Sequence, residues 1–452
     1  MSPPLRSFRT AVTGVLACAL TLLAGCLHEK LAWSPDGSRA AVITSEGLYL
    51  SDAAGTLSPL LVPGAYQAAW CADSQRLVVA RKRPVPTYKE LAQLLGAERT
   101  RALATKAEAV WQPWDALPDT VEHSPDIKVD SDSGAIALYL REHHRDRLKV
   151  KLAKDWKEVE SMSADWHSLQ VVRIDGEALQ VEATLVEGLA PVSQIRPSPK
   201  VAVVAFVSNL ELSPISDESN QLYLAPLDAS KPPVLIAGQT SGFPDWTSTG
   251  RTLLTFRSAS RALGSDELRL GTLSAFPVVD ADGRIAAELK ADDLAGLIFH
   301  DASRVRSLRD GRALFNAAEF NLPLATDERD IRDEFFVIDP AAHRVSRLLP
   351  TAVLAPLPKS LAHFELSPDE TQILVGDDNG KVWLITLTEP KVETVCEGFG
   401  KGDSIAPVWR GPGDFTYRKP AAPRHDLIQR TGGKETVLSR TWPAEVLTHL
   451  VQ

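Results

Sequence analysis

Cysteine is scarce in this sequence, because only four of its 452 residues are Cys. None of them belongs to a CxxC pair or to a Cys/His cluster, so we predict no metal site and no cofactor. The sequence also lacks the GxSxG, HExxH, Walker A and GxGxxG patterns. These patterns mark common hydrolases, zinc peptidases and nucleotide-binding enzymes, and without them we name no catalytic residue.

Positive charge is also in short supply. The chain has 49 Lys and Arg against 58 Asp and Glu, which gives a net charge of −9. Proteins that bind nucleic acid neutralise its phosphates with a basic surface, so this balance predicts no nucleic-acid partner. The chain as a whole also gains little from an anionic lipid surface, and any membrane attachment is therefore predicted to be covalent or hydrophobic.

The amino terminus lacks an apolar run long enough to cross a bilayer. Its apolar run over residues 11–23 follows Arg6 and Arg9 and is shorter than the roughly 20 residues that a spanning helix needs. A short apolar run behind positive charges is typical of a secretory signal. The run ends in Leu23, Ala24, Gly25 and Cys26.

These last four residues resemble the lipobox of bacterial lipoproteins. The resemblance implies that residues 1–25 are a signal peptide, that cleavage precedes Cys26, and that Cys26 carries the lipid. Leu27 follows in place of the Asp that retains lipoproteins at the inner membrane, which favours the outer membrane. We therefore expect a lipid-anchored protein of the bacterial cell envelope, facing the periplasm or the cell surface and touching the membrane only through its anchor. The alternative is an ordinary cleaved signal with a coincidental cysteine.

Export changes the interpretation of the remaining cysteines. Cys18 leaves with the signal and Cys26 is lipidated, so Cys71 and Cys396 remain in an oxidising compartment. Two alternatives stay open for this pair. The two residues form a disulfide, or they are separate, buried, small apolar side chains.

A hairpin pattern opens the rest of the chain. Trp33 ends a short apolar segment, Ser34-Pro35-Asp36-Gly37 has the composition of a tight turn, and residues 39–43 form a second apolar segment. Further short segments at 48–52 and 57–62 follow Gly-containing turns. Four short strands in one sheet cannot bury both faces alone, so this unit predicts further copies.

The same order of aromatic residue, turn and apolar segment recurs along the chain. Six further copies are marked by Trp70, Ser198-Pro199, Trp246, Asp310-Gly311, Ser367-Pro368-Asp369 and Trp409. The repeat resembles that of TolB-type β-propellers, distant relatives of WD-repeat propellers. The resemblance implies an all-β propeller of about seven four-stranded blades over residues 26–445, with six or eight blades as alternatives. No terminus supplies an evident strand to close the ring, and we expect a monomer.

One stretch interrupts the repeat. Residues 86–166 have helical character, with Tyr88, Leu91, Leu94 and Leu95 at helical spacing. We predict a partly helical insertion within the second blade, which either caps a face or meets a partner, or is a mere excursion. Two adjacent His residues at 143 and 144 point about 100° apart on a helix and so predict a solvated face and no metal site.

Two classes of function stay open. The favoured one is a lipid-anchored binding or scaffold module that docks a cell-envelope protein or peptide. The alternative is an enzyme, a lyase or hydrolase, with its site in the central channel. Inward-facing His and carboxylates with metal geometry would favour the enzyme, and an apolar patch at one rim would favour binding.

Overall fold

The computed structural model describes residues 29–116, 133–152, 156–176, 178–210, 220–261, 268–318, 331–398, 405–421 and 424–450. The predicted lipobox, Leu23, Ala24, Gly25 and Cys26, lies outside these residues. Within the described part of the chain, no helix combines the length and the apolar character needed to cross a membrane.

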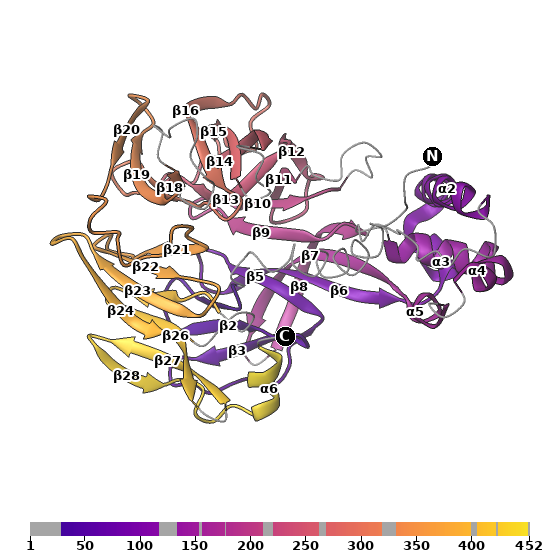
Figure 1. Ribbon diagram of the computed structural model, residues 1–452, viewed down its shortest axis with the longest axis horizontal. Helices are drawn as coiled ribbons and strands as arrows, with labels where there is room; N and C mark the ends of the chain where they lie inside the picture. The colour runs from indigo at the N-terminus through magenta and orange to yellow at the C-terminus, as the bar shows by residue number, and fades with distance from the viewer. Residues whose placement is uncertain are drawn as a thin grey trace, which may run out of the picture.

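Seven four-stranded antiparallel sheets form a ring, and each sheet consists of four consecutive strands (Figure 1). This confirms the predicted seven-bladed β-propeller with a helical insertion in its second blade. We number the blades 1 to 7 along the chain.

The first three blades have the following strands. Blade 1 contains β1 (Leu31–Trp33), β2 (Arg39–Ile43), β3 (Gly47–Asp52) and β4 (Val62–Pro63). Blade 2 contains β5 (Ala65–Trp70), β6 (Arg76–Val85), β7 (Ala164–Asp175) and β8 (Ala178–Gly188). Blade 3 contains β9 (Val192–Pro197), β10 (Val203–Ser208), β11 (Gln221–Pro226) and β12 (Val234–Ala237).

The other four blades complete the ring. Blade 4 contains β13 (Thr240–Trp246), β14 (Thr252–Arg261), β15 (Leu268–Pro277) and β16 (Asp292–His300). Blade 5 contains β17 (Val305–Ser307), β18 (Ala313–Ala318), β19 (Asp333–Asp339) and β20 (Arg344–Arg347). Blade 6 contains β21 (His363–Leu366), β22 (Gln372–Gly376), β23 (Lys381–Thr386) and β24 (Lys391–Glu397), and blade 7 contains β25 (Val408–Gly411), β26 (Asp414–Ala421), β27 (Arg424–Thr431) and β28 (Lys434–Val437).

The position of a strand within its blade explains its sequence. Second strands such as β10 and β18 are buried along their whole length, because neighbouring blades cover both faces, and such strands are continuously apolar. Fourth strands such as β20 and β28 are mostly exposed and polar. The repeated apolar segments in the sequence are therefore the strands at the interfaces between blades.

The tryptophans of the repeat join neighbouring blades. The indole N–H groups of Trp70, Trp246 and Trp409 donate to main-chain oxygens in the first strand of the preceding blade, at 2.8, 2.8 and 3.1 Å. Trp33 stands at the junction of blades 1 and 7, where its indole donates to Oγ1 of Thr416 at 2.9 Å. Each bond pairs a buried polar group across an interface that is otherwise apolar.

The ring closes through side chains and a helix, since all four strands of blade 7 come from one stretch near the end of the chain. After β28, helix α6 (Ala444–His449) lies against blade 1, in one apolar cluster with Leu31 and Trp33. Trp442 is 3% exposed, and its indole donates to the main-chain oxygen of Gly55 at 2.8 Å. Among the described residues, each blade consists of four consecutive strands.

The helical insertion lies between β6 and β7. It contains α2 (Tyr88–Asp115), α3 (Ser133–His143), α4 (Arg145–Leu152) and α5 (Trp156–Ser161). These helices have their own core, which includes Leu91 and Leu95 of the predicted helical pattern. Arg141 fastens α3 to the base of the insertion, because its guanidinium donates to the main-chain oxygens of Pro86 at 2.7 Å and Met162 at 3.0 Å.

The ring has two different faces. Connections between second and third strands lie on one face, which carries the insertion and α6, and we call it the insertion face. The tight turns between first and second strands, and between third and fourth strands, lie on the other face, which we call the turn face. Figure 1 shows the insertion standing off the ring, with α4 at the far end of the molecule and α5 beside the end of β6.

Candidate functional site

Charged side chains gather around the axis of the ring. We call Glu29, Arg196, Asp245, Arg304, Arg306 and Glu365 the axial cluster. Four of them lie in the first strands of blades 3 to 6, Arg304 directly precedes the first strand of blade 5, and Glu29 comes from the segment just before β1. Strands in this position present alternate residues to the axis, so the cluster is a direct product of how blades are arranged.

One layer of the cluster is a run of alternating charge. Each first strand contributes one residue at the same position of the repeat, which in blade 1 is the residue directly before Trp33. These seven residues are Ala32, Ala69, Arg196, Asp245, Arg306, Glu365 and Val408. Blades 3 to 6 therefore present positive, negative, positive and negative side chains in turn, whereas blades 7, 1 and 2 present small apolar ones. Arg306 and Glu365 form an ion pair at 2.9 Å.

Glu29 binds across the ring to the opposite blades. Its carboxylate accepts a hydrogen bond from Nη1 of Arg304 in blade 5 at 2.6 Å, and it pairs with Nη2 of Arg196 in blade 3 at 3.1 Å. The Arg304 side chain is fully buried, and its guanidinium lies 3.8 Å from the ring centroid of Phe243. The segment before β1 therefore reaches the axis and neutralises cations of two other blades.

The environment shifts the protonation of these groups in opposite directions. Burial alone would raise the pKa of the Glu29 carboxyl, but Arg196 and Arg304 outweigh it and hold that pKa well below its usual range. Burial raises the pKa of Asp245 above its ordinary value, although Arg306 acts in the other direction. Burial also lowers the pKa of His363 well below its ordinary value, with Arg304 adding to the effect. Of these two carboxyl groups, Glu29 therefore stays ionised more firmly than Asp245.

A buried His–Asp pair lies next to the axial cluster. Nε2 of His300 is 3.6 Å from Oδ1 of Asp333, and burial raises the pKa of the Asp333 carboxyl. Asn316 links this pair to the cluster, because its side chain donates to Asp333 and accepts from the main-chain N–H of Arg304. Within the described residues, no group of three or more His, Cys, Asp or Glu has the arrangement of a metal site.

Two cavities lie away from the axis. A groove of about 500 Å³ separates α2 of the insertion from blades 2 and 3, and it is lined largely by apolar side chains, among them Leu95, Ala102, Leu185, Leu189 and Leu210. Glu98, Arg99 and Glu187 add charged groups to its lining.

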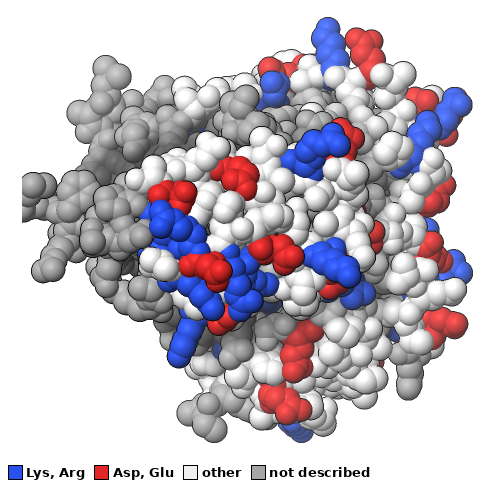
Figure 2. All heavy atoms as spheres, turned by 90° about the vertical axis from the view of Figure 1, so that its right-hand side faces the viewer, with Lys and Arg blue, Asp and Glu red and all other residues white. Residues whose placement is uncertain are grey.

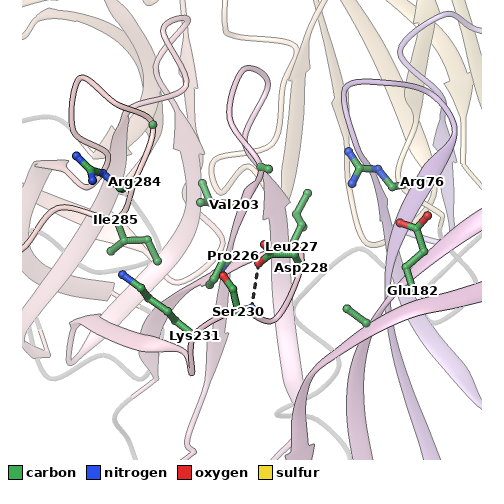
Figure 3. A pocket seen from close by; sticks show the side chains of 13 residues that line it. Arg76, Glu182, Val203, Pro226, Leu227, Asp228, Ser230, Lys231, Arg284 and Ile285 are labelled. Carbon is green, nitrogen blue, oxygen red and sulfur yellow. Dashed lines mark hydrogen bonds between the residues drawn. The ribbon is translucent and has the colours of Figure 1, made fainter.

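The second cavity, of about 420 Å³, opens among blades 2, 3 and 4 at the turn face. In Figure 3, Arg76 and Glu182 stand on one side of it, and Arg284 and Lys231 stand on the other. Arg76 pairs with Asp73 at 2.6 Å, and Arg284 pairs with neighbouring aspartates. Charges of both signs thus surround this cavity.

Cys71 and Cys396, for which a disulfide and two separate buried thiols were the alternatives, lie apart in the structure. Both are free and buried. Cys71 packs between blades 2 and 3, where burial raises the pKa of its thiol to about 12, and Cys396 packs between blades 6 and 7. The disulfide alternative is therefore wrong for this structure, because each thiol is fixed in the core of a different blade interface.

The adjacent histidines of the insertion have separate partners. The His143 ring stacks on Tyr139, whereas His144 stacks on Trp111 and its Nε2 lies 2.9 Å from a Glu108 carboxylate oxygen. His143 is the last residue of α3 and His144 lies in the bend before α4, so the prediction that both stand on one helix is wrong. Their stacking partners differ, although Tyr139 also contacts the His144 ring at 6.4 Å between centroids.

Sequence reasoning missed the axial cluster. Its members are single charged residues beside aromatic or turn positions, and only the alignment of blade repeats places them in one layer. Glu29 carried no signal at all, because it precedes the first repeat. A reader of the sequence would have needed the count of seven blades to see that Arg196 and Arg304 lie opposite blade 1.

The sequence matches no known family model and no curated protein. Among solved structures, the chain is similar to the β-propeller domain of Cps50 (Swd1) from Myceliophteria thermophila, with 11% identity, a TM-score of 0.47, and coverage of 90% of this chain and 96% of that one. The chain is a β-propeller.

Two further solved structures are similar to this propeller. One is hydrazine synthase from Kuenenia stuttgartiensis, with 12% identity, a TM-score of 0.46, and coverage of 91% of this chain and 97% of that one. The other is the β-propeller domain of the Trilobed protease from Pyrococcus furiosus, with 12% identity, a TM-score of 0.37, and coverage of 61% and 75%. At such identities the likeness concerns the fold alone.

Proposed function

We propose that this propeller is a lipid-anchored binding or scaffold module of the bacterial cell envelope, and that it docks another envelope protein or peptide. The observation that carries the proposal is the groove between α2 and blades 2 and 3. An apolar groove beside a helical insertion with its own core is a surface suited to an extended apolar segment of a partner. The lipid anchor is proposed from the resemblance of residues 23–26 to a lipobox.

The groove is a better candidate for partner contact than the axis. Two of the three arginines of the axial cluster, Arg196 and Arg304, already hold a carboxylate of the same chain. The groove, in contrast, lies between two packed parts, because the insertion core includes Ala164 and Trp166 of β7 as well as the helices. Walls that are packed before a partner arrives lower the entropic cost of binding.

A crosslinking pull-down from intact cells tests this function. The full chain is compared with a variant in which a two-residue Asn-Gly turn replaces residues 86–163, since Val85 and Ala164 are already paired in the β6–β7 hairpin. A second comparison uses Ala102→Glu, because Ala102 is exposed and lines the groove. Ala109→Glu is the matched control, since Ala109 is exposed on the same helix outside the groove lining.

The variants separate the outcomes. A specific envelope partner that is lost with the hairpin variant and with Ala102→Glu, and kept with Ala109→Glu, supports a docking module with its contact in the groove. If all variants retain the partner, the partner binds another face of the ring and not the groove. Recovery of no partner contradicts the scaffold function. Incorporation of labelled fatty acid that Cys26→Ser abolishes tests the anchor separately.

A further inference from the structure

The first described residues, which lead from the proposed anchor, lie on the same face of the ring as the insertion. Lys30 precedes β1, and its main-chain oxygen accepts from the N–H of Ile43 at the end of β2, on the insertion face. Glu29 is held there by Arg196 and Arg304. The chain therefore leaves the ring near its axis on this face, and it leaves in a fixed place.

The connection from that place to the proposed lipid is short. Cys26 precedes Glu29 by three residues, and three residues of fully extended chain span at most about 11 Å. With Glu29 clamped, the bilayer surface thus lies within about 11 Å of the insertion face near the axis.

The insertion extends farther from the ring than this. In blade 1 the second strand, β2, has 5 residues, whereas its counterpart in blade 2, β6, has 10. Five additional strand residues at about 3.3 Å each extend blade 2 by about 17 Å beyond its neighbour. The helices then add their own thickness, about 10 Å for one helix. Even with inclined strands, the tip of the insertion reaches the level of the lipid.

The outermost helix has the composition of a headgroup contact. Helix α4 carries four basic residues and one acidic residue in its eight positions. The side chains of Arg145 and Arg147 are 57% and 49% exposed while they pair with Glu160 at 3.2 Å and Asp115 at 2.8 Å, and Lys149 is exposed beside them. Val150 on the same helix is 55% exposed. In Figure 2, which faces this side of the molecule, Lys and Arg gather near the middle, at the level of α4 and α5 in Figure 1, with acidic side chains among them.

This local charge differs from that of the whole chain. The net charge of −9 repels the body of the protein from an anionic surface, whereas the tip of the insertion is basic. A molecule with this asymmetry turns its basic end toward an anionic leaflet. Because the proposed anchor already keeps the protein at the membrane, the effective concentration of lipid headgroups near α4 is high, and a weak contact is enough to hold the helix there.

We propose that α4 rests on anionic lipid headgroups. Because the insertion stands farther from the ring than the proposed anchor reaches, the anchor, the clamped Glu29 and the insertion together hold the propeller in one tilted orientation on the membrane, with the turn face outward. This inference rests on the proposed lipid anchor. It assigns the membrane surface as a second contact of the insertion, next to the groove that we propose for the partner.

Fluorescence quenching on vesicles tests this orientation. The full lipidated protein is placed in phosphatidylcholine vesicles with or without phosphatidylglycerol, with a dye on Val150→Cys at the tip or on Ala342→Cys at the turn face. Ala342 is exposed in the connection between β19 and β20. The thiols of Cys71 and Cys396 are buried, so the introduced thiol is the reactive one. Headgroup-attached nitroxide is the quencher, and flotation reports the anchor independently.

We expect strong quenching and a blue shift at Val150→Cys, with Ala342→Cys unchanged. The double variant Arg145→Glu/Lys149→Glu should lose the part of the quenching that depends on phosphatidylglycerol, whereas Lys231→Glu/Arg344→Glu, on the turn face, should keep it. A long Gly-Ser insertion before Glu29 should reduce the quenching at Val150→Cys.

Equal quenching at the two dye positions, in protein that floats with the vesicles, would overturn the orientation and leave the anchor intact. Protein that fails to float would overturn the anchor and the inference together. Thermal unfolding of each variant in solution checks that the ring is folded.

Discussion

Replacing Glu29 by Gln is the sharpest test of the axial cluster. The substitution keeps the shape of the side chain and removes its charge, which leaves the fully buried guanidinium of Arg304 and the 17% exposed side chain of Arg196 without their shared counter-ion. Breaking a buried ion pair by removing one partner costs about 3–5 kcal/mol. Because Glu29 itself is 19% exposed, we expect the lower end, about 3 kcal/mol.

Urea unfolding of the chain from residue 27 onward measures this loss as a lower midpoint with an unchanged slope. The matched control is Glu90→Gln, which removes the charge from an ion pair with Arg83 in which both side chains are 39% exposed. An exposed pair contributes less than about 1 kcal/mol. A loss for Glu29→Gln no larger than that of the control would refute the structural role of the clamp.

The same variant has a defined acid signature. The pKa of Glu29 lies well below its ordinary value of 4.5 in the folded chain, so the unfolded chain binds the proton first. The contribution of Glu29 is therefore complete above about pH 4.5 and is lost as the pH falls toward the folded pKa. Glu29→Gln should flatten the decline of the unfolding free energy below pH 4.5, and an unaltered decline would contradict the ion pairing.

Three further predictions concern single side chains. Trp246→Phe removes the indole hydrogen bond to the main-chain oxygen of Arg196 and should lower the free energy of unfolding in urea by about 2 kcal/mol. Trp383→Phe should cost less in the same assay, because the buried indole N–H of Trp383 has no partner among the described residues. Equal costs would contradict the role of the Trp246 hydrogen bond. Burial lowers the pKa of His167 from 6.5 to about 4, so the unfolding free energy should fall by up to about 3 kcal/mol between these pH values, and His167→Gln should reduce this slope in a pH series. Trp442→Ala should cost about 3–5 kcal/mol in urea unfolding, and a loss under about 1 kcal/mol would show that ring closure does not need it.

The repeat made the fold predictable because each of its elements has a local cause. Ser34 and Asp36 hydrogen-bond within the turn at 2.6 Å, and Gly37 takes a φ of 68°. In the sixth copy Ser367 and Asp369 make the same bond, but Glu370 takes the positive φ, at 61°. The turn therefore survives the loss of its glycine, since the Ser–Asp bond is local, and this is why degenerate copies still marked blades correctly.

The axial cluster was not predictable in the same way. Its contacts join residues far apart in the chain, such as Glu29 and Arg304, which are 275 positions apart. No local preference places an arginine beside Phe243 or an aspartate beside His300. Such contacts follow only from the number of blades and the radial order of strands, and the sequence left that number open between six, seven and eight.

Both ends of the described chain meet at blade 1, and this bears on how the ring withstands load. The first strand of that blade, β1, pairs with β2 over only three residues, and it is the first strand that a pull on the amino terminus would reach. The ion pairs of Glu29 with Arg196 and Arg304 stand before it along the chain. On the other side, α6 and Trp442 cover the same blade. If Cys26 carries the proposed anchor, tension from the membrane passes first to blades 3 and 5 through the clamp, and the three pairings of β1 are spared.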